Sequence, residues 1–367
     1  MKVLVVHPPM YPVNYKFYNM LGKYVKLTVW QFGEYPSDHS DWTYENLKYL
    51  NDNITIKVIG KGGDSIQNQF KIFQFFPDLR SLNPDIVLSI AFWIPSLYFS
   101  LIKKFLKFKF IILTNAIYET EKNNSEMRKI IRKLISLNTD MFISSSNLTT
   151  EYLKSINSNS KIYLSLQTID VKDWQKKFLE LESKVQLKIK LFNKTNNIIM
   201  LGVGNYISKK NWIAVIEIMH KFPNLFFVLV GDGDEHELYN IKIKNLQLNE
   251  RVLLVGRKSG KALKEYYKAA DFLIFPSLYD QFGFVVPEAL CSGLPVICTK
   301  NAGAEVLIKE GYNGYIMQDN IDMITKIDVM MKNYKNMNQN AYCSIEEMSL
   351  ENRALEFYDS FNKVTKQ

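Results

Sequence analysis

The sequence is poor in the residues that mark unusual protein classes. Its 367 residues include only 16 Gly and 11 Pro, too few for a collagen-like chain or a disordered linker protein. The three cysteines (Cys291, Cys298 and Cys343) are odd in number and form no C-x-x-C pair. They predict free thiols in a reducing cytoplasm rather than a disulfide framework. With 47% hydrophobic residues, the chain has enough apolar mass for a core, and its length favours two domains.

Long hydrophobic runs are also missing. The longest uncharged run, between Asp85 and Lys103, has 17 residues and is interrupted by Pro95, so it predicts a strand at 86–90 followed by a turn and a helix rather than a membrane span. The apolar run Val3–Val6 is too short for the core of a signal peptide and predicts a buried first strand instead.

Positive charge is in excess and unevenly placed. The net charge is +9, and residues 101–133 alone hold nine basic and three acidic side chains. Within this window, cations alternate with phenylalanines, a mixture that suits an anionic membrane surface; the cations are Lys103, Lys104, Lys107 and Lys109. A solvated helix face explains the same pattern. No nucleic-acid recognition motif accompanies the charge, so we expect no nucleic-acid partner.

Short apolar runs separated by helix-length segments occur in both halves of the chain, which predicts two α/β domains with doubly wound parallel sheets. The expected strands are 3–6, 27–30, 54–58, 86–90, 110–113 and 141–144, then 198–201, 225–230, 252–255, 272–275 and 296–298. The polar, Lys-rich segment 172–195 predicts the junction. We expect a first domain at 1–175, a second at 196–340, and a C-terminal helix within 341–367 that packs back on the first domain.

The densest chemical signal lies between residues 275 and 297. A buried strand ends at Phe275, and Pro287, which is tolerated in the first turn of a helix, predicts a helix that opens near Phe284. The free N–H groups of Gly283, Phe284 and Val285 would then form an anion site for a phosphate.

Two carboxylates, Asp280 and Glu288, flank this proposed phosphate site. Carboxylates are poor phosphate ligands but good acceptors for hydroxyl groups. The arrangement therefore suits a diphosphate between two polyols, as in a nucleotide sugar. Two ordinary acids at a helix N-terminus, favoured by the helix dipole, are the alternative interpretation.

The same segment resembles the retaining glycosyltransferases of family 4. That family has an acid, then Gly-Phe-Gly, then a second acid eight residues after the first, and Asp280-Gln-Phe-Gly-Phe-Val-Val-Pro-Glu288 fits this spacing. Further matching segments begin at Leu201, Val228, Leu254, Tyr266 and Gly311. The resemblance implies the GT-B architecture, in which two facing Rossmann-like domains enclose an interdomain cleft, with the donor bound by the second domain.

The resemblance also implies roles for individual residues. Lys210 matches the lysine that contacts the donor diphosphate, Asp280 the acid that holds the donor sugar, and Glu288 the acid that holds the ribose. Lys210 and Asp280 are therefore the expected catalytic residues. The other expected donor-binding positions are Gly204, Asn205, Lys209, Gly256, Arg257, Phe282, Gly283, Phe284 and Val285.

The acceptor half carries weaker signals. His7, Asn115 and Tyr118 follow predicted strands and are candidate acceptor contacts, although a structural role for His7 is the stronger interpretation. Asp232 and Asp234 form an Asp-x-Asp pair that fits a strand-to-helix turn better than a metal site, and if Lys210 and a helix N-terminus neutralise the diphosphate, no metal or other cofactor is needed.

The resemblance, together with these features, implies a retaining, metal-independent glycosyltransferase that moves a hexose from a nucleotide diphosphate sugar to a hydroxyl acceptor. We expect the acceptor to be a glycan or lipid-linked glycan of cell-surface polysaccharide synthesis, used in the cytoplasm or at the inner face of the membrane. A non-catalytic sugar-nucleotide-binding partner of an active transferase is the alternative, because Asn205 replaces a common arginine and no His follows the strand at 110–113. A nicotinamide-dependent dehydrogenase is disfavoured because Gly202-x-Gly204 lacks the third glycine.

Overall fold

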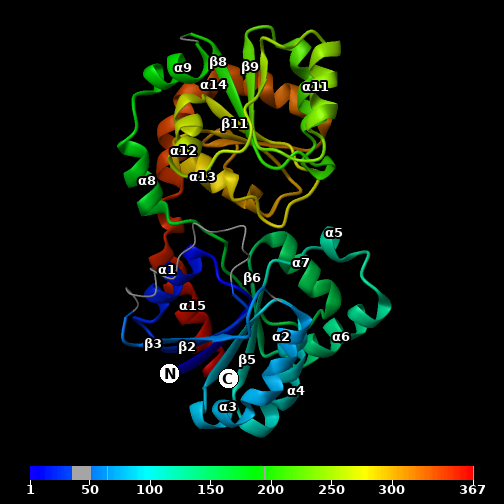
Figure 1. The fold of residues 1–367 in the computed structure, drawn as a ribbon, viewed down its shortest axis with the longest axis vertical. Coiled ribbons are helices and arrows are strands. Elements are labelled where there is room, and N and C mark those ends of the chain that lie inside the picture. The colour runs from blue at the N-terminus through cyan, green and yellow to red at the C-terminus, as the bar shows by residue number, and fades with distance from the viewer. Residues whose placement is uncertain (35–50, 64, 194–195, 367) are drawn as a thin grey trace. The chain divides into compact units, whose positions relative to one another are not determined.

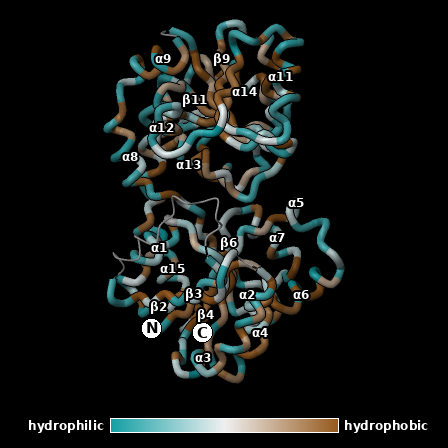
Figure 2. The backbone as a smooth tube through the Cα atoms, in the orientation of Figure 1, coloured by the Kyte–Doolittle hydropathy of each residue, from teal (hydrophilic) through white to brown (hydrophobic). Residues whose placement is uncertain are grey.

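The chain forms two compact units. The computed structural model describes residues 1–34, 51–63, 65–193 and 196–366. Unit 1 consists of Met1–Gln167 and Leu350–Gln367, and unit 2 of Thr168–Ser349. Both are built around a sheet of apolar strands, which Figure 2 shows in brown.

Unit 1 has a seven-stranded parallel sheet in the order β3-β2-β1-β4-β5-β6-β7. Its strands are β1 (Lys2–His7), β2 (Lys26–Phe32), β3 (Ile54–Ile59), β4 (Ile86–Ile90), β5 (Lys109–Thr114), β6 (Met141–Ser144) and β7 (Ile162–Leu164). Its helices are α1 (Pro12–Leu21), α2 (Ile66–Phe70), α3 (Phe76–Leu82), α4 (Ile94–Leu106), α5 (Tyr118–Glu121), α6 (Glu126–Leu137), α7 (Asn147–Ile156) and α15 (Leu350–Thr365).

The central strand of unit 1 is apolar on both faces. Val3 and Val5 belong to the core on the side of α1 and α15, whereas Leu4 and Val6 belong to the core on the other side. Successive residues of a strand point to opposite faces, so an unbroken apolar run is typical of a sheet covered by helices on both sides.

Unit 2 repeats the design with a six-stranded parallel sheet in the order β10-β9-β8-β11-β12-β13. Its strands are β8 (Ile198–Val203), β9 (Leu225–Val230), β10 (Val252–Leu254), β11 (Phe272–Phe275), β12 (Val296–Thr299) and β13 (Gly314–Met317). Its helices are α8 (Val171–Leu179), α9 (Lys184–Phe192), α10 (Trp212–Ile218), α11 (His236–Asn245), α12 (Gly260–Ala269), α13 (Val285–Cys291) and α14 (Asn320–Ser344).

Helix α15 is distant in sequence from the rest of unit 1 but packs against α1 (Figure 1). Its apolar residues recur every three or four positions and are buried; they are Leu350, Ala354, Phe357, Phe361 and Val364. The ring of Phe357 lies edge-on to that of Phe17, with centroids 4.9 Å apart. This contact anchors the C-terminal helix to α1.

The structure places all eleven expected strands, with small changes at their ends, and adds β7 and β13. The expected junction, 172–195, holds the helices α8 and α9. The chain passes from unit 1 to unit 2 between residues 167 and 168 and returns to unit 1 between residues 349 and 350. The expected domain bounds were 175, 196 and 341. The second boundary lies later than expected because α14 continues to Ser344, and only a short turn separates it from α15.

The uncharged run before Lys103 forms β4 and most of α4, as predicted. None of the described helices combines the length and the hydropathy needed to cross a bilayer. All three cysteines are free thiols, two of them buried.

Replacing Phe357 by alanine tests the anchoring of α15. The side chain is fully buried, and we expect Phe357→Ala to lower the free energy of unfolding of unit 1 by about 3–5 kcal/mol. Phe105→Ala is the matched control, because Phe105 is 83% exposed and its loss should change stability by less than about 0.5 kcal/mol. Denaturant unfolding measures both, and equal effects would contradict the packing described.

Candidate functional site

The candidate site lies in unit 2, where the sheet order reverses. Strand β8 has β9 on one side and β11 on the other, so the connections after β8 and β11 leave toward opposite faces of the sheet. In open parallel sheets, ligands bind beyond the carboxyl ends of the strands at this reversal. The loops there hold most of the residues expected to bind the donor.

Lys210 and Asp280 meet at this edge. The Lys210 Nζ lies 2.6 Å from an Asp280 carboxylate oxygen, and the two side chains are only 14% and 17% exposed. Lys210 also lies over the Phe275 ring, 4.9 Å from its centroid. The structure thus brings together the two residues predicted to be catalytic, and places a shielded cation beside an acid.

The backbone around Asp280 is firmly held. Its N–H donates to the carbonyl of Asn301 and its carbonyl accepts from Gly303, at 3.1 Å each. The second carboxylate oxygen accepts a hydrogen bond from the N–H of Phe282 at 3.2 Å. The acid is therefore fixed by the loop that follows β12, a contact that extends the β11–β12 pairing.

Gly283 begins the turn into α13. Its φ is +99°, and a Cβ at this position would lie 2.5 Å from the Phe275 ring, so both conformation and space require glycine. The N–H groups of Gly283, Phe284 and Val285 donate to no described residue. Phe282 is buried, whereas Phe284 is 45% exposed. These three N–H groups are therefore open among the described residues, and the anion site stays a prediction.

Glu288 lies one turn into α13 and is largely buried. Its carboxylate accepts a hydrogen bond from the Tyr267 hydroxyl at 2.7 Å. Burial raises the pKa of Glu288 to about 7, although the hydrogen bond from Tyr267 and the charge of Lys264 oppose the shift. Among the described residues, Glu288 forms no hydrogen bond or ion pair with Lys210 or Asp280. The two acids therefore occupy different environments.

The remaining expected donor residues lie on three neighbouring loops. A Cβ on Gly204 would lie 3.6 Å from the Lys210 side chain, which places the two residues side by side. Asn205 is exposed, and its carbonyl accepts from the Trp212 indole at 3.2 Å. The carbonyl of Lys209 accepts from the N–H of Leu278, which joins the loops after β8 and β11.

Gly256 and Arg257 follow β10, two strands from β8. The Gly256 carbonyl accepts a hydrogen bond from Gly231 at 3.2 Å, and the Arg257 side chain is exposed. Neither touches Lys210 or Asp280 among the described residues. They lie at the outer part of the same sheet edge.

The candidate acceptor residues belong to unit 1. His7 is buried, with its Nδ1 2.6 Å from the Pro8 carbonyl, and burial lowers its pKa to about 4. The His7 imidazole is therefore neutral near pH 7 and packed in the interior of unit 1, and its role stays a prediction. Asn115 and Tyr118 follow β5, and the Tyr118 side chain is 63% exposed.

The basic segment from the end of α4 to the start of β5 does not form the continuous surface that its sequence suggested. Lys103 pairs with Asp140 at 2.8 Å and is only 14% exposed, while Phe108 and Phe110 are buried in the core. Of the expected cations, Lys104 and Lys107 are exposed and Lys109 is partly buried. The alternation arises because the chain passes from α4 into β5 within these residues, which turns every second side chain inward.

Sequence reasoning missed the residues that surround Glu288. Trp174 of α8 packs edge-on against Tyr267, with ring centroids 5.6 Å apart, and its indole N–H donates to Ser292. Ser277, just after β11, is buried and its hydroxyl has no hydrogen-bond partner among the described residues. Helical spacing could have placed Tyr267 on a buried face, but no local signal brings α8 to α13.

Asp232 and Asp234 do not gather with other metal ligands. Asp232 accepts hydrogen bonds from the N–H of Gly233 and from His236, as expected for a turn. No group of three His, Cys, Asp or Glu side chains within the described ranges is arranged to hold a metal ion. The absence of a cofactor stays a prediction.

Comparison with known proteins finds a family match within the second unit. Residues 183–344 match the family model described as "Glycosyl transferases group 1". An uncharacterized glycosyltransferase of Methanocaldococcus jannaschii is 29% identical over 40% of this chain and 38% of its own length. The UDP-Gal:alpha-D-GlcNAc-diphosphoundecaprenol alpha-1,3-galactosyltransferase of Escherichia coli is 27% identical over 45% and 47%. The matches thus span less than half of these relatives.

Solved structures extend the likeness to the whole fold. The Anabaena Alr3699/HepE structure in complex with UDP has a TM-score of 0.75 at 14% identity and covers 99% of this chain and 100% of its own. The apo form of the lipopolysaccharide outer core galactosyltransferase WaaB also has a TM-score of 0.75 at 14% identity and covers 99% of each chain. The chain therefore has the GT-B fold of two Rossmann-like domains, and its residues 183–344 are similar to the group 1 glycosyltransferases.

Proposed function

We propose that the protein is a retaining, metal-independent glycosyltransferase that moves a hexose from a nucleotide diphosphate sugar to the hydroxyl of a glycan or lipid-linked glycan. It would act in the cytoplasm, where its three free thiols stay reduced. The contact between Lys210 and Asp280 carries the proposal. It joins a cation to a carboxylate that can accept hydrogen bonds from sugar hydroxyls, at the edge of the sheet where ligands bind in open parallel sheets.

Each part of the site suits one part of such a donor. Lys210 and the open N–H groups of residues 283–285 would hold the diphosphate and stabilise the charge that develops when it leaves. Asp280 would accept hydrogen bonds from sugar hydroxyls, and Glu288 from those of the ribose. The cation and the backbone donors would supply the neutralisation that a metal ion provides elsewhere.

Retention would follow from attack on the face from which the diphosphate departs. The bond between the anomeric carbon and the phosphate oxygen breaks, the acceptor oxygen bonds to that carbon, and the acceptor proton passes to the departing phosphate oxygen. Lys210 makes the diphosphate a better leaving group, so its charge matters most in the transition state.

Two relatives suggest which substrates to test first. HepE has been solved with UDP and with UDP-glucose, and the Escherichia coli relative is named for a UDP-galactose donor and a diphosphoundecaprenol acceptor. We therefore propose a UDP-sugar as donor and a lipid-linked glycan as the first acceptor to try.

Lys210→Ala tests the site. Loss of a preorganised cation beside the leaving group should lower kcat by about 100- to 1,000-fold, and Asp280→Asn should weaken sugar transfer as well. Transfer from radiolabelled UDP-sugars, with a chelator present, measures both the activity and its independence of metal.

Lys326→Ala is the matched control, because Lys326 is also ion-paired in unit 2, with Glu310 at 2.8 Å. It should retain normal turnover. Normal turnover in Lys210→Ala would refute the assigned role, and loss of transfer in chelator would refute metal independence.

The elevated pKa of Glu288 predicts a pH-dependent affinity for the donor. Ribose hydroxyls bind better to a carboxylate than to a carboxylic acid, so donor affinity should rise as Glu288 loses its proton between about pH 6 and pH 8. A UDP-sugar is the suitable probe, because its diphosphate does not titrate in this range. Glu288→Gln should bind more weakly and lose this pH dependence; an unchanged profile would argue against a contact between Glu288 and the donor.

Protein stability should respond in the opposite direction. The pKa of Glu288 is higher in the folded chain than in the unfolded chain, so the folded state holds the proton more tightly. The unfolding free energy gained from this tighter proton binding is fully present below about pH 4.5 and is lost as the pH rises through about 7. Relative to Glu288→Gln, the wild type should therefore lose about 3 kcal/mol of unfolding free energy by about pH 8, as measured by denaturant titration. Parallel stability profiles would contradict the shift.

A further inference from the structure

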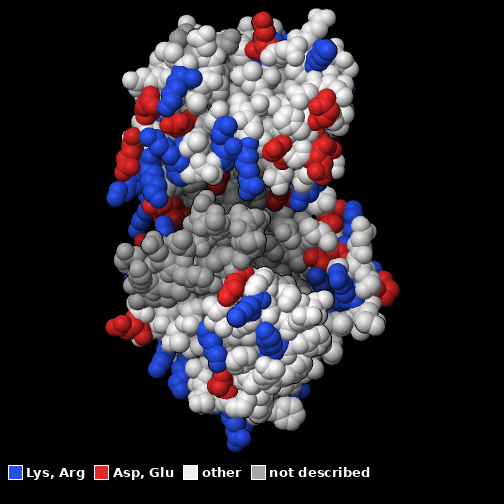
Figure 3. Space-filling view, in the orientation of Figure 1, with Lys and Arg blue, Asp and Glu red and all other residues white. Residues whose placement is uncertain are grey.

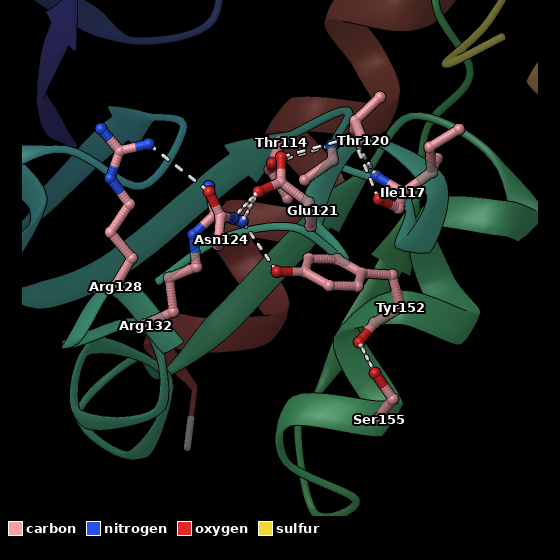
Figure 4. A network of polar contacts seen from close by, with 10 residues as sticks. Thr114, Ile117, Thr120, Glu121, Asn124, Arg128, Arg132, Tyr152 and Ser155 are labelled. Carbon is pink, nitrogen blue, oxygen red and sulfur yellow. Dashed lines mark hydrogen bonds and ion pairs between the residues drawn. The ribbon is translucent and has the colours of Figure 1, made fainter. Parts of the chain in front are cut away.

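A second polar site lies within unit 1. A cavity of 370 Å³ opens between α5, α6 and α7. Tyr118 comes from α5, Lys129, Arg132 and Lys133 from α6, and Tyr152 from α7. Figure 4 shows the polar network beside it, with Arg132 directed toward Tyr152 and Glu121.

Arg132 is fixed at the wall of this cavity. Its guanidinium lies 2.7 Å from the Tyr152 hydroxyl and 2.5 Å from a Glu121 carboxylate oxygen, and its side chain is only 16% exposed. It also lies over the Phe92 ring, 5.1 Å from the centroid. These contacts hold the guanidinium in one orientation, so its remaining donors are preorganised for an anion with several oxygens.

The cavity is positively charged. Four cations and one carboxylate line it, and Lys and Arg side chains are visible near α5 and α6 in Figure 3. Lys133 forms no ion pair with any residue that the structure describes. Lys122 and Lys129 pair with acids of their own turns in solvent-exposed pairs, which are weak and readily exchanged for a multivalent anion. This chemistry suits a phosphate or diphosphate group.

Helix α6, which supplies three of the cations, also has an apolar face that is exposed to solvent. Four large side chains of α6, spaced three or four residues apart, are between 41% and 71% exposed: Met127, Ile130, Leu134 and Leu137. Helix α4, which packs against α6, adds the exposed Leu101 and Phe105. Lysines and arginines border these residues on α6. An exposed apolar row edged by cations is typical of helices that lie on anionic membranes.

We propose that the cavity and the α6 row together bind an anionic lipid phosphate at the membrane surface. The phosphate or diphosphate lies against Lys129, Arg132 and Lys133, and the hydrocarbon lies against the row that includes Ile130 and Leu134. Charge complementarity selects this occupant, because a free phosphate would leave the apolar row in water. The inference rests on the proposed function, in which such a lipid carries the acceptor glycan.

Sedimentation with lipid vesicles tests the proposal. The full chain should bind phosphatidylcholine vesicles that contain a polyprenyl phosphate and should bind plain phosphatidylcholine vesicles much more weakly. Lys129→Gln/Lys133→Gln should weaken binding by about thirtyfold, and Ile130→Glu/Leu134→Glu by about tenfold or more. Arg132 is left intact because its contacts also support the fold.

Matched variants on helices of unit 2 control for charge and for apolar surface. Lys332→Gln/Lys335→Gln removes two exposed lysines of α14, and Leu238→Glu/Ile241→Glu changes two apolar residues of α11 that are 48% and 50% exposed. Both should retain the vesicle binding of the wild type. Equal losses in the test and control variants would overturn the proposal.

A soluble probe separates a lipid site from a site for free phosphate. Inorganic pyrophosphate should compete only weakly with the vesicles. If it binds as tightly as the polyprenyl phosphate vesicles, and Ile130→Glu/Leu134→Glu leaves vesicle binding unchanged, the lipid assignment is wrong. Thermal stabilisation by UDP, measured for each variant, reports on the donor site separately. If UDP does not stabilise the wild type, the proposed function is refuted. The lipid site is decided by vesicle binding alone.

Discussion

The parallel direction of the strands is the constraint on which the candidate site depends. Within the described sheets every pair of neighbouring strands is parallel, so each loop that follows a strand emerges at the same edge. Residues that are remote in the sequence meet there without any long excursion of the chain. Lys210 and Asp280, 70 residues apart, come into contact because each follows one of two adjacent strands.

The same edge gives two similar acids different properties. Asp280 is held by an ion pair with a lysine and by a backbone donor. Glu288, eight residues later, is surrounded by Tyr267 and neighbouring aromatic side chains, and burial there favours the neutral acid. One short motif thus supplies one acid held in an ion pair and one whose charge changes near neutral pH.

Most of the fold could be predicted from the sequence because long buried strands leave a strong local pattern. The strand at 225–230 is apolar throughout and was placed at its observed bounds. Strands β7 and β13 were missed because they are only partly buried, so their sequences contrast little with their flanks. The motif residues 280–288 were also recognisable, since glycine and proline at fixed positions specify a strand, a turn and a helix.

The contacts between elements could not be predicted in the same way. Nothing in the sequence near Glu288 indicates that Tyr267 or Trp174 will surround it, because these residues come from α12 and α8. The segment from Lys103 to Phe110 was expected to form a continuous basic surface, and this was wrong for a related reason. Composition shows that cations and aromatic side chains are mixed there, but it does not show which of them face the core. The exposed row on α6 became visible only when burial was known.

Helix α15 has a consequence for how the protein is made. Unit 1 is discontinuous, since its α1 surface is completed by residues from 350 onward. On the ribosome, a chain emerges from its N-terminus, and domains tend to fold as they appear. Unit 2 is continuous, so all of its residues are synthesised before the residues from 350 onward that complete unit 1. The N-terminal part of unit 1 must therefore wait with an uncovered apolar face until residues 350 onward have been synthesised, a period in which a chaperone would be of most use.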